Sequence, residues 1–277
     1  MINEMPAADA GAYEDEDAGP MVHPIGPQDL MDALSKGLAD FNAMPTHLVF
    51  LAVIYPLVTI VFARIYAGYD VLPLVFPLIA GYTLIGPLVA VGMYELSRRR
   101  EKGLDFSRRK AFHVFQRHSI RSIATLGALL MVIYTGWLVV AWVLYVINFG
   151  GEVPESVADF ALQILTTGPG WALIIVGGSI GFFFAVVVFS LSVISFPMVL
   201  DRDVTVMIAM KTSVRAVLAS PVTMGLWGII VAAALFVGSL PFFVGLCVVL
   251  PVLGHATWHL YRKAVEPDDS WDGPARS

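Results

Sequence analysis

The sequence has 277 residues, of which 57% are hydrophobic and only 14% are charged. Ordinary soluble domains have roughly 45–50% apolar and about 25% charged residues, so this composition excludes a typical soluble protein. The apolar residues also occur in runs of about 20, the length that an α-helix needs to cross a hydrocarbon core of about 30 Å. The single cysteine, Cys247, excludes an intramolecular disulfide. The net charge of -5 gives no sign of a nucleic-acid-binding protein. We therefore expect an all-α, polytopic membrane bundle.

The N-terminal region has two parts. Residues 1–27 are acidic, rich in Pro, Ala and Gly, and lack the features of a cleavable signal peptide, which predicts a disordered cytoplasmic tail. From Pro27 to Met44, apolar residues recur at three- and four-residue spacing between charged residues. This pattern predicts an amphipathic helix that is too polar to span the membrane, with its charged positions, such as Asp40, on the polar face.

Six transmembrane helices follow from the apolar runs. The fifth and sixth are separated by turn residues at Gly238–Pro241, because the apolar stretch around them is too long for one helix. The predicted spans are His47–Tyr66, Val71–Tyr94, Ser122–Phe149, Pro169–Leu200, Val222–Leu240 and Pro241–Leu260. They form one membrane domain, residues 28–265, before a cytoplasmic C-terminal tail, residues 266–277.

The positive residues predict the orientation of this bundle. If the N-terminus is cytoplasmic, 16 of the 17 Lys and Arg residues fall on the cytoplasmic side, and Arg64 alone falls outside. The outer loop, residues 150–168, contains three acidic residues and no Lys or Arg. The positive-inside rule therefore favours an even number of spans, with both termini in the cytoplasm.

Two pairs of segments predict an internal repeat. Residues 31–45 (MDALSKGLADFNAMP) overlay residues 207–221 (MIAMKTSVRAVLASP) without a gap, and residues 87–99 (PLVAVGMYELSRR) overlay residues 251–263 (PVLGHATWHLYRK). Each end of the chain thus reads as an interfacial helix followed by a membrane hairpin. A weaker middle unit would use residues 106–120 and the third and fourth spans. Such repeats occur in transporters and also in scaffolds, so the repeat alone does not choose between them.

Three stretches carry a family resemblance. They are GPLVAVGMYELSRRREKG (86–103), LDRDVTVMIAMKTSVRAVLASP (200–221) and LPVLGHATWHLYRK (250–263). Over roughly residues 28–265 the chain resembles the bacterial integral-membrane family called domain of unknown function 2189. The resemblance implies a multi-span inner-membrane protein and brings no catalytic residues with it.

Two histidines are candidate ligands. His255 and His259 are four residues apart and therefore share a face of the sixth predicted helix. They are candidates for metal or haem ligation, although no third ligand accompanies them at an obvious spacing. Alternatively, with Trp258 and Tyr261 they form an interfacial belt between headgroups and hydrocarbon. A role in binding a proton or a substrate is a third interpretation. All three stay open, and we expect no cofactor.

Three carboxylates near the cytoplasmic ends of spans are further candidates. Glu95 precedes an arginine run, which predicts a local ion pair, but in the repeat it overlays His259 and so can face this imidazole across a pseudo-symmetry axis. Asp201 and Asp203 follow the fourth span, and Asp203 is placed to cap the next helix.

The basic loop after the second span predicts contacts with lipids. Because it adjoins two spans, anionic headgroups on the cytoplasmic side are nearer partners than nucleic acid. The expected headgroup contacts are Arg98, Arg99, Arg100, Arg108, Arg109 and Lys110.

Three functions remain open from the sequence. We expect no enzyme, because the chain has no phosphate-binding glycine loop and no HExxH, GxSxG or CxxC motif. The first expectation is a non-enzymatic accessory or scaffold protein, within a larger membrane complex or a homo-oligomer. The alternatives are a small transporter or lipid-handling protein and a haem- or metal-binding membrane protein.

Overall fold

The computed structural model describes residues 19–44, 64, 68–104, 119–240 and 243–267. Apart from Arg64, the first predicted span lies outside the described residues. The predicted interfacial helix of the middle unit also lies outside them, except for its last two residues.

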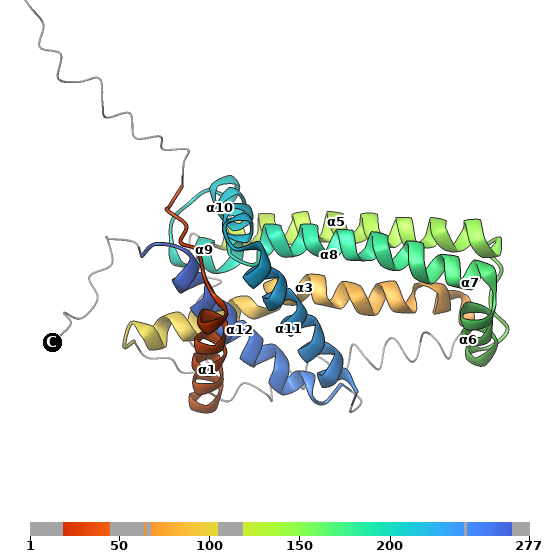
Figure 1. Ribbon diagram of the computed structural model, residues 1–277, viewed down its shortest axis with the longest axis horizontal. Coiled ribbons are helices and arrows are strands. Elements are labelled where there is room, and N and C mark those ends of the chain that lie inside the picture. Colours follow the sequence, from red (N-terminus) through yellow and green to blue (C-terminus); the bar gives the residue numbers. More distant parts are fainter. Residues whose placement is uncertain (1–18, 45–63, 65–67, 105–118, 241–242, 268–277) are drawn as a thin grey trace, which may run out of the picture.

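Long helices run along the molecule. Helix α3 (Leu72–Glu101) follows a short 3-10 turn, η1 (Tyr69–Val71), and contacts α5 (Ser119–Phe149). The chain returns beside α5 as a nearly continuous helical stretch, which Figure 1 shows next to α5. This stretch comprises α7 (Gly168–Ala172), a π-helical turn η3 (Leu173–Gly177), α8 (Gly178–Ser192) and α9 (Ser195–Asp201).

The structure agrees with a helical membrane protein. Among the described residues, the helical stretches Ser119–Phe149, Gly168–Asp201 and Pro221–Ser239 are long and apolar enough to cross a membrane. Their outer faces expose large apolar side chains, such as Ile147 (73% exposed) and Phe182 (72% exposed). Lipid is the solvent that such surfaces favour. The predicted all-α membrane bundle is thus confirmed, whereas the number of six spans stays a prediction.

Shorter helices complete the two ends of the bundle. Helix α6 (Val157–Thr166) lies in the predicted outer loop and is capped by Ser156, whose hydroxyl accepts a hydrogen bond from the Asp159 amide. At the other end lie α1 (Pro27–Ala43), α10 (Val206–Ala219), α11 (Pro221–Ser239) and α12 (Leu246–Ala264), as Figure 1 shows.

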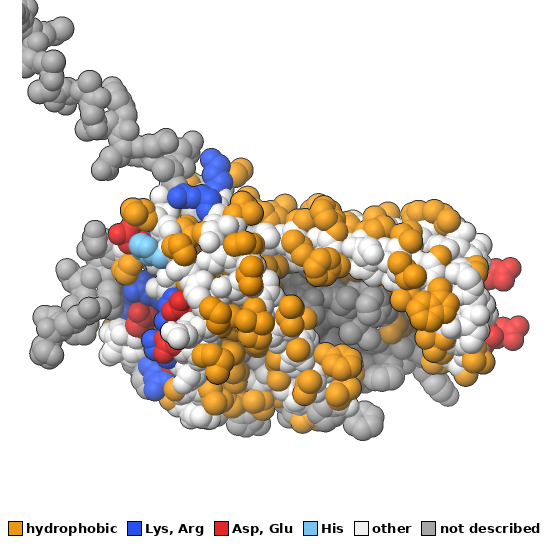
Figure 2. Space-filling view, in the orientation of Figure 1, with side chains coloured by type: hydrophobic (Ala, Val, Ile, Leu, Met, Phe, Trp, Pro, Cys, Tyr) orange, Lys and Arg blue, Asp and Glu red, His pale blue; other side chains and the backbone are white. Residues whose placement is uncertain are grey.

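Charge is segregated between these ends. In Figure 2, hydrophobic side chains cover the long helices, and acidic side chains mark the end near α6 and α7. Basic side chains, with acidic ones among them, gather at the end formed by α1, α9, α10 and α12. We call this end the charged end.

The two ends of the described chain also meet at the charged end. Val22 and Val265 form an antiparallel bridge, the His23 amide donates to the Ala264 carbonyl (2.9 Å), and the Glu266 amide donates to the Met21 carbonyl (3.1 Å). Ile25 is buried beside them and donates its amide proton to the Ser220 hydroxyl (2.8 Å). Residues 19–26, which the sequence assigned to a disordered tail, thus include a segment paired with the bundle.

Helix α1 packs on α12 through a face that the sequence pattern identified only in part. Leu30 and Met31 both belong to the predicted apolar pattern, but Leu30 is buried and Met31 is 68% exposed. The other buried residues of the helix are Ala33, Gly37 and Asp40. The prediction that Asp40 lies on the polar face is therefore wrong. The reason is a close helix crossing, which the missing side chain of Gly37 permits and which turns the Asp40 side of α1 inward.

Gly37→Ala is expected to destabilise the protein by about 1–3 kcal/mol through overpacking. A Cβ at this position would lie 2.6 Å from the Ala256 backbone nitrogen, so α1 would have to move away from α12. Gly225→Ala in α11 is the matched control, because its Cβ would meet nothing within 4 Å and should stabilise the helix slightly. Unfolding of both purified variants in detergent compares them, and equal stability would contradict the tight crossing.

Candidate functional site: a network of charges at the helix ends

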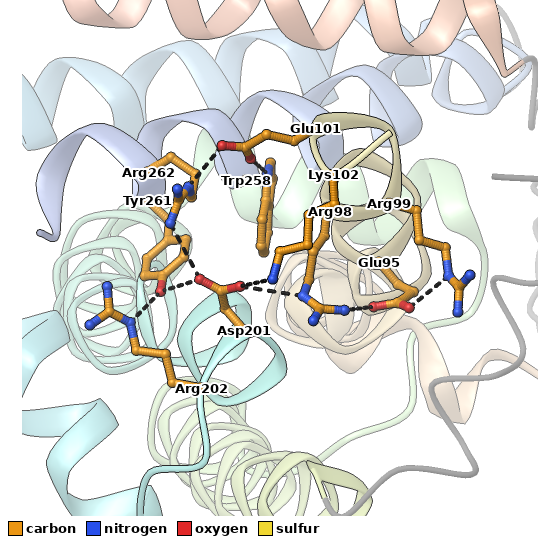
Figure 3. Close-up of polar contacts among 10 residues, drawn as sticks. All are labelled: Glu95, Arg98, Arg99, Glu101, Lys102, Asp201, Arg202, Trp258, Tyr261 and Arg262. Carbon is orange, nitrogen blue, oxygen red and sulfur yellow. Dashed lines mark hydrogen bonds and ion pairs between the residues drawn. The ribbon is translucent and has the colours of Figure 1, made fainter. Parts of the chain in front are cut away.

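The C-terminal ends of α3, α9 and α12 meet at the charged end. Each carries the triplet Leu-x-Arg, as Leu96–Arg98, Leu200–Arg202 and Leu260–Arg262. The three leucines are between 0% and 2% exposed, so they anchor the helix ends in the core. The arginine two residues later then projects from each end into the space between the helices, as Figure 3 shows.

These arginines connect the three helix ends in a cycle. The Nε group of each donates a hydrogen bond to an acceptor on a neighbouring helix, in the order α3 to α9, α9 to α12 and α12 to α3 (Figure 3). The three bonds join Arg98 to Asp201 Oδ1 (3.3 Å), Arg202 to the Tyr261 hydroxyl (3.0 Å), and Arg262 to Glu101 Oε1 (3.1 Å). We call these six residues the arginine ring.

Asp201 is the central acceptor of the ring. Its Oδ2 accepts from the Tyr261 hydroxyl at 3.0 Å and from Arg262 Nη1 at 3.5 Å, and Lys102 Nζ lies 3.8 Å from Oδ1. The Asp201 side chain is only 6% exposed, and that of Arg98 only 9%. Charges with so little exposure need partners, because desolvation costs each of them several kcal/mol, on the order of what close opposite charges regain.

Two more carboxylates extend the network along α3. Glu95 is fully buried and lies 3.2 Å from Arg98 Nη1 and 2.8 Å from Arg99 Nε. Its predicted local ion pair is therefore present. Glu101 accepts a hydrogen bond from the Trp258 indole at 2.9 Å in addition to the one from Arg262.

A second group, the Asp40 cluster, joins α1 to α3 and α12. Asp40 is 4% exposed and receives a hydrogen bond from the Ser97 hydroxyl (2.5 Å) and one from Arg100 Nη1 (2.5 Å). His259 Nε2 lies 2.9 Å from the same carboxylate, and the Ser97 hydroxyl lies 2.7 Å from His255 Nδ1. The cluster thus consists of Asp40, Ser97, Arg100, His255 and His259.

The pKa of Asp40 follows from this arrangement. Burial acts most strongly and raises the pKa, but the hydrogen bonds from His259 and Ser97 and the nearby imidazoles together outweigh it. The net result is a pKa below the ordinary value of 3.8. Asp40 is therefore a buried anion that holds α1 against two other helices.

The structure shows what the candidate histidines contact. His255 and His259 do lie on the same side of α12, because both imidazoles approach Asp40 Oδ2, at 3.9 Å and 2.9 Å. His259 thus faces this carboxylate of α1. Across the described part of the chain, no group of three or more His, Cys, Asp or Glu side chains is arranged to hold a metal ion.

The remaining candidates are divided between buried and exposed positions. Asp203 is exposed and does not cap α10; the cap is Thr205, whose hydroxyl accepts from the Ile208 amide at 3.3 Å. Among the predicted headgroup contacts, Arg98 is buried in the ring, whereas the Arg100 side chain is 37% exposed. Arg108, Arg109 and Lys110 lie outside the described residues.

Several network members were missed by reasoning from the sequence. Asp40 was assigned to a polar face, and Ser97, Glu101 and Arg202 were not singled out, because helical periodicity assigns charged and small polar residues near helix ends to solvent. One signal was present: the triplet Leu-x-Arg recurs at the ends of three predicted spans. The repeat overlay aligned the ends of the second and sixth predicted spans. Adding the end of the fourth span would have indicated that the three arginines occupy equivalent positions.

Comparison with family models gives a match. Residues 75–201 match the family described as predicted integral membrane protein (DUF2189). No curated protein and no solved structure matches the chain. The match covers α5, α8, α9 and nearly all of α3, including Glu95, Arg98, Glu101 and Asp201 of the network, and it ends one residue before Arg202. Over residues 75–201 the chain therefore carries the signature of the DUF2189 family of predicted integral membrane proteins.

Proposed function

We propose that this protein is a non-enzymatic accessory or scaffold protein of the bacterial inner membrane. The arginine ring is the observation that carries the proposal. Its charged groups are engaged with one another across three helices. Arg98 and Asp201 have little exposure, whereas the Glu101 side chain is 30% exposed. Mutual contacts of this kind fix the relative positions of helix ends, which is what a protein needs in order to present a constant surface to a partner.

The packing supports a repeated architecture. In the proposed scheme each of three units has an interfacial helix and a hairpin, and α3, α9 and α12 are the last helices of successive units. These three contact one another, α1 contacts α12, and α10 contacts α8 and α9. Each described interfacial helix thus packs on the last helix of the preceding unit, counted cyclically. The donations within the ring follow a cycle through the same three ends.

The orientation has support from the same end of the molecule. The N- and C-terminal segments pair there, which agrees with an even number of membrane crossings. Basic side chains also gather there, and acidic ones mark the opposite end (Figure 2). By the positive-inside rule the charged end faces the cytoplasm.

Purification of the full-length tagged chain from its source membranes in mild detergent tests the proposal. We expect a protein partner at constant stoichiometry with the wild type. Asp201→Asn, which weakens the ring, should release this partner, whereas Asp203→Asn, an equal change at an exposed position, should retain it. A monodisperse chain carrying lipid or solute and no partner would instead favour a transporter or lipid-handling protein. A visible absorption band would favour a haem protein.

A further inference from the structure

Helix α10 is held at the membrane boundary by both of its ends. It begins at Val206, only a few residues after the apolar stretch Gly168–Asp201, and ends at Ala219, directly before the apolar helix that starts at Pro221. Two helices of membrane-spanning character therefore fix α10 at the level where hydrocarbon meets headgroups. With 14 residues at about 1.5 Å each, α10 extends about 20 Å along this boundary.

The outward side of α10 combines cations with large apolar side chains. Ala209, Thr212, Ser213 and Ala216 are buried and form its inward side. The exposed stripe consists of Met207, Lys211, Arg215 and Leu218 and continues into Val222 of α11. Leu218 is 71% exposed and Val222 84%, and Figure 2 shows Lys and Arg side chains gathered over α10 beside hydrophobic ones. We call these five residues the α10 stripe.

We propose that the α10 stripe is a docking surface for anionic lipid headgroups. A stripe of this kind matches the interface chemically, because its apolar side chains enter the acyl boundary while its cations meet headgroup phosphates. Charge complementarity selects anionic over zwitterionic lipid, since each cation near an anionic surface contributes about 1 kcal/mol of binding. The residues of this surface differ from the headgroup contacts expected from the sequence, which lie between Arg98 and Lys110.

The corresponding helix of the first unit shows that the cations are particular to α10. In the overlay of residues 31–45 on 207–221, Lys211 corresponds to Ser35 and Arg215 to Ala39. Helix α1 carries a single cation, Lys36. Its outward side therefore offers no matching stripe of two cations, and we assign anionic-lipid docking to α10.

Titration of the purified full-length protein with phosphatidylglycerol or phosphatidylcholine, in neutral detergent, tests the proposal. The readout is the melting temperature from tryptophan fluorescence. Phosphatidylglycerol should stabilise the wild type at a lower concentration than phosphatidylcholine does. Lys211→Gln with Arg215→Gln should raise the half-stabilising concentration of phosphatidylglycerol roughly 30-fold, which corresponds to two cations at about 1 kcal/mol each. Lys36→Gln with Arg64→Gln removes two exposed cations elsewhere and should leave it unchanged.

Two further measurements separate the parts of the surface. Leu218→Ser should weaken the stabilisation by both lipids, because it removes apolar contact and no charge. For the wild type, 1 M NaCl should abolish the preference for phosphatidylglycerol, since the Debye length falls to about 3 Å. Inorganic phosphate alone should not stabilise the protein. An unchanged preference in the α10 double variant, or an equal loss in the Lys36 and Arg64 variant, would overturn the proposal and leave α10 as a surface for another partner.

Discussion

Asp201→Ala is expected to lower the free energy of unfolding by about 3–5 kcal/mol, because it breaks a buried ion-pair network from one side. The carboxylate meets Arg98, Lys102, Tyr261 and Arg262, and the exchange would leave these groups facing one another without their shared acceptor. The ends of α3, α9 and α12 would lose their common contact. We therefore expect the three helix ends to separate.

Unfolding of the purified protein in mixed micelles by a denaturing detergent measures this effect. Asp203→Ala is the matched control, two residues further along the chain and exposed, and should change stability by no more than about 0.5 kcal/mol. If the two variants were equally stable, the ring would make no net contribution to the fold, and the proposed scaffold role would lose its principal support.

The second large effect is expected at Asp40. Asp40→Ala should destabilise the protein by about 2–3 kcal/mol, because Ser97, Arg100 and His259 would lose the carboxylate that they share. The lower part of the buried-pair range applies, since the Arg100 side chain is 37% exposed and water can replace part of the contact. Asp32→Ala, which removes more exposed ion pairs with Lys36 and with Lys263 of α12, should cost below about 1 kcal/mol.

The stabilising effect of Asp40 should depend on pH in a defined direction. Because its pKa in the folded protein lies below 3.8, the folded state binds this proton less readily than the unfolded state does. The stabilisation is therefore complete above the ordinary pKa and is lost as the pH falls through the lowered value. Asp40→Asn should remove this part of the loss of stability in acid, measured as the difference between wild type and variant from pH 6 to pH 3. A constant difference over that range would contradict the assignment of Asp40 as the titrating anion.

The segments that cross the membrane were predictable because their signal is local. Ser122–Phe149 and Pro169–Leu200 were predicted from apolar runs, and the structure has helices over Ser119–Phe149 and Gly168–Asp201. Chain length and side-chain transfer energy suffice for such predictions, since every residue in hydrocarbon meets the same solvent. The resemblance to DUF2189 was stated from three motifs. Residues 86–103 lie within the matched residues 75–201, whereas residues 250–263 and nearly all of residues 200–221 lie beyond them.

The predicted site was less complete, because its residues come from separate segments. Glu95 and Asp201 were recognised as carboxylates near membrane ends. Nothing in the sequence indicated that Asp201 would accept hydrogen bonds from α12, whose Tyr261 and Arg262 are 60 and 61 positions away. Asp40 was assigned to the polar face of α1, because periodicity describes one helix and not the neighbour that packs against it.

The sequence by itself determined that the chain is a helical membrane protein, because runs of apolar residues and the distribution of Lys and Arg are summed along the chain. Only the tertiary structure decided that the charged residues at one end lie between helices and neutralise one another. A buried charge is tolerated only where its partners converge on it, and whether they converge depends on the packing of segments far apart in sequence. The close crossing at Gly37, which brings Asp40 to His259, is the clearest case: no feature of α1 alone specifies Ala256 as its neighbour.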